Sequence, residues 1–123
     1  MNFELRSIAA KGDLQNERVT LRANADLDVG DYLLMQCGYR QGSVTTDVFH
    51  TFWFPYKAVA KGDLVVLYTR KGTESSKPLK AKGLAHFFYW GLSASIWAAE
   101  AKAAVLLQAP TWDSKPARDL WRR

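Results

Sequence analysis

The segment from Asn16 to Asn24 alternates strictly between apolar and polar residues, and this pattern constrains the fold more than any other feature of the chain. Val19, Leu21 and Ala23 fall on one side of an extended backbone, whereas the residues between them are polar or charged. A period of two residues indicates a strand with one buried face. A glycine turn and a second apolar run follow directly, so the sequence predicts a β protein.

Seven apolar or alternating runs predict about seven strands, at residues 3–9, 17–23, 32–37, 44–54, 64–69, 86–90 and 103–108. Turns built on glycine separate them, and short strands at such spacing are typical of a sandwich or barrel. The pentapeptide Ala-Lys-Gly-Asp-Leu occurs at residues 10–14 and again at 60–64. Because the flanking sequences differ, we interpret it as repeated turn chemistry rather than an internal duplication.

Residues 93–108 carry conflicting signals. The segment is rich in alanine and contains Glu100 and Lys102, and this composition favours helix. The alternative is a hairpin, in which one strand ends at Ile96-Trp97 and another begins at Ala103. Local propensity alone predicts a helix here.

Length and cysteine content set further bounds. With 123 residues, of which 48% are hydrophobic, the chain can form one domain with its own core. Cys37 is the only cysteine, so no intramolecular disulfide can form, and we expect a buried thiol on a strand. No signal peptide is evident, and no stretch approaches the ~20 apolar residues that span a bilayer. We therefore expect a cytoplasmic protein.

Several motifs occur in an order that is typical of one family. The Asn-Glu pair with its alternating strand at 16–24 comes first, and the turn at 27–32 follows. Phe54-Pro55, the turn at 61–63 and the valine-rich strand at 65–69 come next. In this order and spacing the chain resembles the lamin tail domain family, an immunoglobulin-like β-sandwich.

The resemblance covers roughly residues 3–108 and has departures. Tyr32 stands where the family has tryptophan, Lys61 stands for proline, and residues 98–102 do not match the family's last turn. The resemblance implies an all-β, immunoglobulin-like sandwich and favours the hairpin at 93–108. It also implies a non-catalytic module that contacts proteins, nucleic acid or surfaces. We accordingly expect a sandwich domain at 1–110 and a basic tail with tryptophans at 111–123.

The sequence predicts no catalytic residues and no cofactor. Gly91-Leu92-Ser93-Ala94-Ser95 is similar to a nucleophile elbow but lacks its second glycine. A serine nucleophile also needs a base, and the only histidines are His50 and His86. Both lie in aromatic strands, where we expect structural or exposed side chains. We therefore expect that the protein is not an enzyme.

No metal site is predicted either. Asp26, Asp28 and Asp31 place carboxylates at spacings that a calcium loop uses, with Gly30 to turn the chain. The distant bidentate glutamate of such a loop is absent, so we interpret the cluster as a solvated turn between strands.

The aromatic run at 49–56 bears on binding. Because a strand directs alternate residues to opposite faces, Phe52 and Phe54 share one face and Phe49 and Trp53 share the other. The structural interpretation is that these aromatic rings belong to a core spread over both sheets. The functional alternative is that some rings are exposed as a partner surface or a stacking platform.

Candidate contact residues lie in two basic regions. A polar loop at 71–82 contributes Lys71, Lys77, Lys80 and Lys82. The tail contributes Trp112, Arg118, Trp121, Arg122 and Arg123. Tryptophan and arginine anchor interfaces disproportionately, so we expect the tail to bind a protein partner or a second copy of the chain. The net charge of +5 keeps a second hypothesis open, in which the loop and tail bind nucleic acid.

Overall fold

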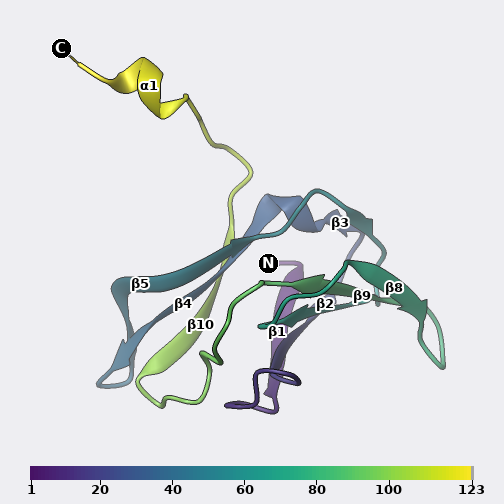
Figure 1. The fold of residues 1–123 in the computed structure, drawn as a ribbon. Helices are drawn as coiled ribbons and strands as arrows, with labels where there is room; N and C mark the ends of the chain where they lie inside the picture. Colours follow the sequence, from purple (N-terminus) through teal and green to yellow (C-terminus); the bar gives the residue numbers. More distant parts are fainter. Residues whose placement is uncertain (123) are drawn as a thin grey trace.

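The computed structural model describes residues 1–122, in which strands predominate and the only α-helix is four residues long, so the predicted all-β class is confirmed (Figure 1). The strands are β1 (Phe3–Ala9), β2 (Arg18–Ala23), β3 (Leu27–Asp28), β4 (Tyr32–Arg40), β5 (Ser43–Trp53), β6 (Ala58–Val59), β7 (Leu64–Tyr68), β8 (Ser75–Pro78), β9 (Leu84–Tyr89) and β10 (Lys102–Gln108). A 3-10 turn, η1 (Val29–Asp31), precedes β4, and the helix α1 (Ala117–Leu120) lies in the tail.

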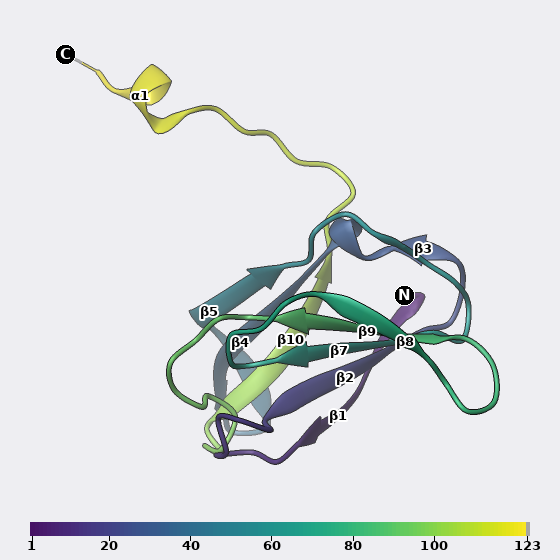
Figure 2. The same ribbon diagram turned by 45° about the vertical axis from the view of Figure 1, so that its right-hand side comes forward.

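The strands form three sheets (Figures 1 and 2). A five-stranded sheet has the order β1-β2-β7-β9-β8, a three-stranded sheet has the order β10-β4-β5, and β3 pairs with β6. All pairs are antiparallel except β7 and β9, which are parallel. The tail leaves the end of β10 and projects away from the domain in both views.

All seven predicted strands are present, and the sequence missed the three shortest. Two of these, β3 and β6, contain two residues each. The third, β8, lies within residues 71–82, which the sequence predicts as a loop, and that prediction is wrong for Ser75–Pro78. The four residues of β8 are all exposed and carry no apolar alternation, so only pairing with β9 makes them a strand.

Residues 93–108 do not form the helix that local propensity favours, and the hairpin that the resemblance favours is present only in its second half. Lys102–Gln108 is a strand that pairs with β4 at seven consecutive positions. Ile96 and Trp97 belong to no strand, because their backbone N–H groups point to the carboxylate of Glu17 instead. Pairing and burial therefore outweigh the helix propensity of the alanines.

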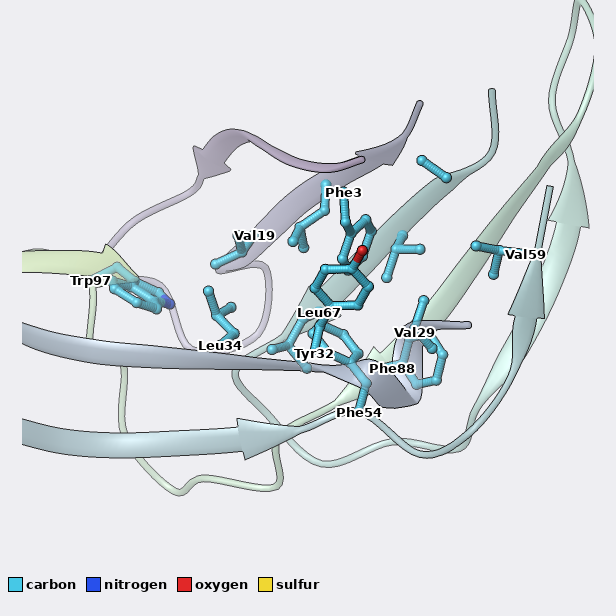
Figure 3. Close-up of a cluster of buried hydrophobic side chains, with 13 residues drawn as sticks. Phe3, Val19, Val29, Tyr32, Leu34, Phe54, Val59, Leu67, Phe88 and Trp97 are labelled. Carbon is cyan, nitrogen blue, oxygen red and sulfur yellow. The ribbon is translucent and has the colours of Figure 1, made fainter. Parts of the chain in front are cut away.

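One apolar core fills the space between the five-stranded and three-stranded sheets (Figure 3). Edge-to-face ring contacts join the two sheets: Phe54 lies 5.8 Å from Phe3 and 5.5 Å from Phe88, measured between centroids. Such pairs are worth about 0.5–1.5 kcal/mol beyond the area they bury. The core therefore fixes how the sheets face each other.

The apolar patterns of the sequence predict that Val19, Leu21, Val65, Leu67, Trp97 and Val105 are buried together, and all of these except Val105 lie in this cluster. The prediction is wrong for Val105, which is only half-buried. It pairs with Met35 on the face of the three-stranded sheet that points away from the core, while its neighbours Ala104 and Leu106 pack inward. A strand that is apolar on both faces does not reveal its register in the sequence.

The two copies of Ala-Lys-Gly-Asp-Leu form the same turn. In each copy the aspartate N–H donates to the alanine carbonyl, from Asp13 to Ala10 and from Asp63 to Ala60, both at 3.0 Å. Gly12 and Gly62 have φ angles of +86° and +94°, a conformation that glycine adopts without strain. The shared local geometry supports the interpretation as repeated turn chemistry.

Candidate functional site

The most deeply buried polar group is the carboxylate of Glu17, at the start of β2. It is fully buried and accepts four hydrogen bonds, from the Thr69 hydroxyl at 2.7 Å and from the backbone N–H groups of Gly12 (2.8 Å), Ile96 (2.9 Å) and Trp97 (3.3 Å). A buried charge is tolerated only when hydrogen bonds replace its lost water. This carboxylate is therefore an internal anchor for the segment before β10.

A second network joins Asp63, His86, Ser76 and Lys57. Asp63 Oδ2 lies 2.8 Å from His86 Nε2, so Nε2 carries a proton and donates to the carboxylate. The Ser76 hydroxyl lies 3.0 Å from His86 Nδ1, and Lys57 Nζ donates to Ser76 Oγ at 3.0 Å. His86 and Asp63 are both buried, whereas Ser76 is an exposed residue on the edge strand β8.

The electrostatics of Asp63 follow from this network. Burial alone would raise the pKa of its carboxyl group. Hydrogen bonds from His86 and from the backbone N–H groups of Ala60 and Leu84 more than compensate, so the pKa lies below its ordinary value. The same bonds tie the 60–63 turn to β9, which is a structural role.

The order of groups, hydroxyl, imidazole and carboxylate, is that of a serine nucleophile, its base and the carboxylate that orients the base, but the two ring nitrogens have exchanged places relative to that arrangement. The sequence interpretation of His86 as structural or exposed missed the network, because Asp63 and Ser76 lie 23 and 10 residues away from it. Catalysis needs further parts, above all donors placed for an oxyanion. Lys57 Nζ, which hydrogen-bonds to Ser76 Oγ itself, is not placed as a separate oxyanion donor by this contact.

The predicted turn at Asp26–Asp31 is built by its carboxylates. Asp28 Oδ1 accepts from the N–H groups of Gly30 and Lys57, both at 2.8 Å, and Asp26 accepts from Lys61 at 2.8 Å. Within residues 1–122, no group of three histidine, cysteine, aspartate or glutamate side chains could hold a metal ion together. Cys37 is a buried free thiol on β4, as predicted.

One candidate contact surface is the outward face of the three-stranded sheet, which we call the uncharged face. Paired residues of neighbouring strands share a face, so the pairings of Leu33, Met35, Cys37 and Tyr39 on β4 define it. Its members are Leu33, Met35, Cys37, Tyr39, Val44, Val48, Thr51, Trp53, Ala103, Val105 and Leu107. None of these paired residues carries a charge, and five of the apolar side chains are exposed: Tyr39, Val44, Val48, Trp53 and Leu107. The exposed ring of Phe49, which a bulge in β5 leaves out of the pairings, has the Lys102 ammonium 3.5 Å from its centroid, so one cation borders the face.

The tail borders this face. Trp112 packs edge-to-face on Trp53, with ring centroids 5.1 Å apart, and Trp53 is held by a hydrogen bond from Nε1 to the Gly30 carbonyl. None of residues 113–122 of the tail is buried, and Leu120 and Trp121 are 60% and 77% exposed. The tail is thus an extension of the uncharged face rather than part of the core.

The second candidate surface is the outward face of the five-stranded sheet, which we call the cationic face. Its register places three rows of side chains across the five strands. The rows are Ala9, Arg18, Tyr68 and Tyr89; then Ser7, Thr20, Val66, Phe87 and Ser75; then Glu4, Arg22, Leu64, Ala85 and Lys77, so that one carboxylate, Glu4, lies opposite Arg22. Arg70 follows β7 and lies over the rings of Tyr68 and Tyr89, at 4.9 Å and 5.1 Å from their centroids.

The structure separates the basic residues that the sequence grouped together. Lys77 lies on the cationic face with its ammonium 5.7 Å from the Phe87 centroid, and Lys71 lies beside Arg70. Lys80 and Lys82 are exposed in the connection between β8 and β9. Arg118, in α1, and Arg122, at the end of the tail, are exposed, whereas Arg123 lies outside the described residues.

Sequence reasoning missed Arg18, Arg22 and Arg70 as candidate contacts. The sequence could have indicated Arg18 and Arg22, because both lie on the polar side of the alternating segment at residues 16–24. Arg70 had no signal, since only the parallel pairing of β7 with β9 brings Tyr68 and Tyr89 together beneath it.

No known protein family and no curated protein sequence matches the chain. None of the helices within residues 1–122 has the length and apolar character needed to cross a membrane.

Proposed function

We propose that the protein is a non-catalytic assembly module, in which the tail of one copy packs on the uncharged face of a second copy. The observation that carries this proposal is the position of the tail: Trp112 packs at the margin of the face, and Leu120 and Trp121 beyond it are exposed. Exposed contiguous apolar surface marks interaction sites in soluble proteins.

Charge favours a second copy as the occupant. Each chain carries a net charge of +5, so two copies repel each other over most of their surface. The uncharged face is the exception, because none of its members is charged. Leu120 and Trp121 offer apolar side chains of the kind that anchor an interface.

Length and area agree with this arrangement. The three strands have nine, eleven and seven residues, so the face is about 14 Å wide and about 23–36 Å long, which is less area than a stable dimer buries per partner. Residues 109–122 of the tail can extend by roughly 45 Å, which is longer than the face. Two exchanged tails therefore add the contact area that the face lacks.

Sedimentation velocity tests the proposal. We expect the full chain to self-associate, and Val48→Lys on the face and the double change Leu120→Ser and Trp121→Ser in the tail each to prevent it. Ser43→Lys is the matched control, because Ser43 is an exposed residue of β5 outside the uncharged face, and it should leave association unchanged.

Mixing the two defective variants separates tail exchange from other dimers. Val48→Lys retains an intact tail, and the tail variant retains an intact face, so the mixture should form a complex with one tail on one face. A mixture that stays monomeric, although the wild-type chain associates, would show that the tail does not bind the face of another copy.

The non-catalytic part of the proposal is tested at Ser76. We expect the wild-type chain and Ser76→Ala to hydrolyse p-nitrophenyl acetate at the same background rate, because Lys57 occupies the hydroxyl oxygen and the His86–Asp63 pair ties two loops. A wild-type rate above background that is lost in Ser76→Ala contradicts the proposal.

We also propose the immunoglobulin-like sandwich type and a relationship to lamin tail domains. Two sheets that enclose one core support the sandwich type. The parallel pair of β7 and β9 departs from a purely antiparallel arrangement. An experimental structure whose strand order cannot be superposed on lamin tail domains would reject the relationship.

A further inference from the structure

We propose that the cationic face binds single-stranded nucleic acid, with phosphates at its arginine and lysine side chains and bases against its aromatic rings. This site is independent of the assembly surface, because it lies on the other sheet. It differs from the basic loop and tail that the sequence suggested, and of those residues it retains only Lys71 and Lys77.

The first argument is the fixed position of Arg70. Its Nε donates to the Gln15 carbonyl at 2.9 Å and one terminal nitrogen donates to the Lys71 carbonyl at 2.8 Å. Beneath it the rings of Tyr68 and Tyr89 stack at 5.3 Å with an angle of 11°. No carboxylate within residues 1–122 pairs with this guanidinium. A cation that is immobilised without a counter-ion loses little side-chain entropy when it binds an anion.

The second argument is a hollow beside Arg70. It has a volume of about 350 Å³ and is lined by Leu14, Gln15, Arg70, Lys71, Gly91, Leu92 and Ser93. Two cations, a hydroxyl group and apolar side chains border it, and none of the lining residues is acidic. This combination suits a phosphate together with the sugar or base attached to it.

The third argument concerns where the carboxylates are. Five of the twelve acidic residues accept hydrogen bonds from backbone N–H groups: Asp13, Glu17, Asp26, Asp28 and Asp63. In the described part of the chain, Arg6 and Glu4 form the only pair between a lysine or arginine and a carboxylate. Arg22 lies opposite Glu4, whereas Arg18, Arg70 and Lys77 have no carboxylate paired with them among the described residues and are left to attract an external polyanion.

The aromatic rings decide the class of polyanion. Arg18 and Arg70 flank Tyr68, and Lys77 lies over Phe87, so cations and rings alternate along the face. An acidic peptide needs the cations but not the rings. A duplex hides the faces of its bases, whereas a single strand can stack them on aromatic side chains. The distance from Arg18 to Arg22 along β2 is about 13 Å, enough for a short stretch of strand.

Fluorescence anisotropy with a labelled oligothymidylate, measured over a series of salt concentrations, tests the proposal on the full chain. Each phosphate contact contributes about −0.7 to the slope of log affinity against log salt. Arg70→Gln should weaken binding and make this slope shallower by about 0.7. Tyr68→Leu should weaken binding about fivefold to a hundredfold and leave the slope unchanged, because stacking involves no counter-ions.

Arg40→Gln is the matched control for charge, because Arg40 is exposed at the end of β4 on the other sheet. Equal effects of Arg70→Gln and Arg40→Gln would overturn the proposal, as would competition by polyglutamate at equal charge with no effect of Tyr68→Leu. Phe87→Leu serves as a second ring variant if Tyr68→Leu lowers the unfolding temperature. Val48→Lys should bind the oligonucleotide normally, which separates this site from the assembly surface.

Discussion

The carboxylate of Glu17 accepts a hydrogen bond of 2.9 Å from the backbone N–H of Ile96, which lies 79 residues further along the chain. The same carboxylate accepts a hydrogen bond from the hydroxyl of Thr69, the residue that follows β7. One side chain thus holds the start of β2, the end of β7 and the segment before β10 together. It also explains why an alanine-rich stretch with helical propensity stays irregular.

The first prediction concerns this anchor. Glu17→Ala should lower the free energy of unfolding by at least about 3 kcal/mol, because each donor left unpaired in the interior costs about 1–3 kcal/mol. Urea denaturation measures the change. Glu74→Ala, at an exposed position in the connection between β7 and β8, is the control and should change little. A loss of less than about 1 kcal/mol would show that water replaces the carboxylate.

The second prediction concerns the core. Leu67→Ala should lower the free energy of unfolding by about 2–5 kcal/mol, because Leu67 is buried between the sheets. Leu120→Ala, in the exposed tail helix, should change it by less than about 0.5 kcal/mol. Thermal unfolding of the two variants side by side checks the difference. Equal stability of both variants would contradict the placement of β7.

The third prediction concerns pH. Because the pKa of Asp63 in the folded protein is lower than its ordinary value of 3.8, the ionised carboxylate stabilises the fold above that value. This contribution should be lost as the pH falls below about 4. Urea midpoints measured across this range should show a steeper acid decline for the wild-type chain than for Asp63→Asn. Asp13→Asn, in the exposed copy of the same turn, should keep the wild-type profile.

The fourth prediction concerns the tail. A chain that ends at Thr111 should unfold within about 2 °C of the full chain, because no described residue of the tail beyond Thr111 is buried. It should nevertheless lose self-association. Circular dichroism against temperature measures the first effect. Unfolding of the shortened chain would show that contact between Trp112 and Trp53 supports the core.

The sequence predicted the long strands because their patterns are local. The alternation around Val19 and Leu21 specifies both a strand and the face that it buries. The sequence could not predict β8, since Ser75–Pro78 has no apolar pattern, nor the outward position of Val105, since β10 is apolar on both faces.

The candidate sites were harder to predict than the strands, for a physical reason. Arg70 contacts Tyr68 two residues away but also Tyr89, which only the strand pairing brings near. The link between Asp63 and His86 likewise joins two strands that are distant in the sequence. The tail residues Trp112 and Trp121 could be proposed as contact residues from composition alone. Their exposure does not depend on how strands pair.

The parallel pairing of β7 with β9 has a consequence for the order in which the chain folds. After β7 the chain passes to the outer edge as β8 and then returns as β9, which lies between β7 and β8. The strand β8 pairs with β9 alone, through a short connection, so these two strands can form a hairpin on a timescale of about 1–10 μs. The stack of Tyr68 and Tyr89 therefore depends on closing a loop of the residues 69–83 that separate β7 from β9, a larger loop than the one that joins β8 to β9.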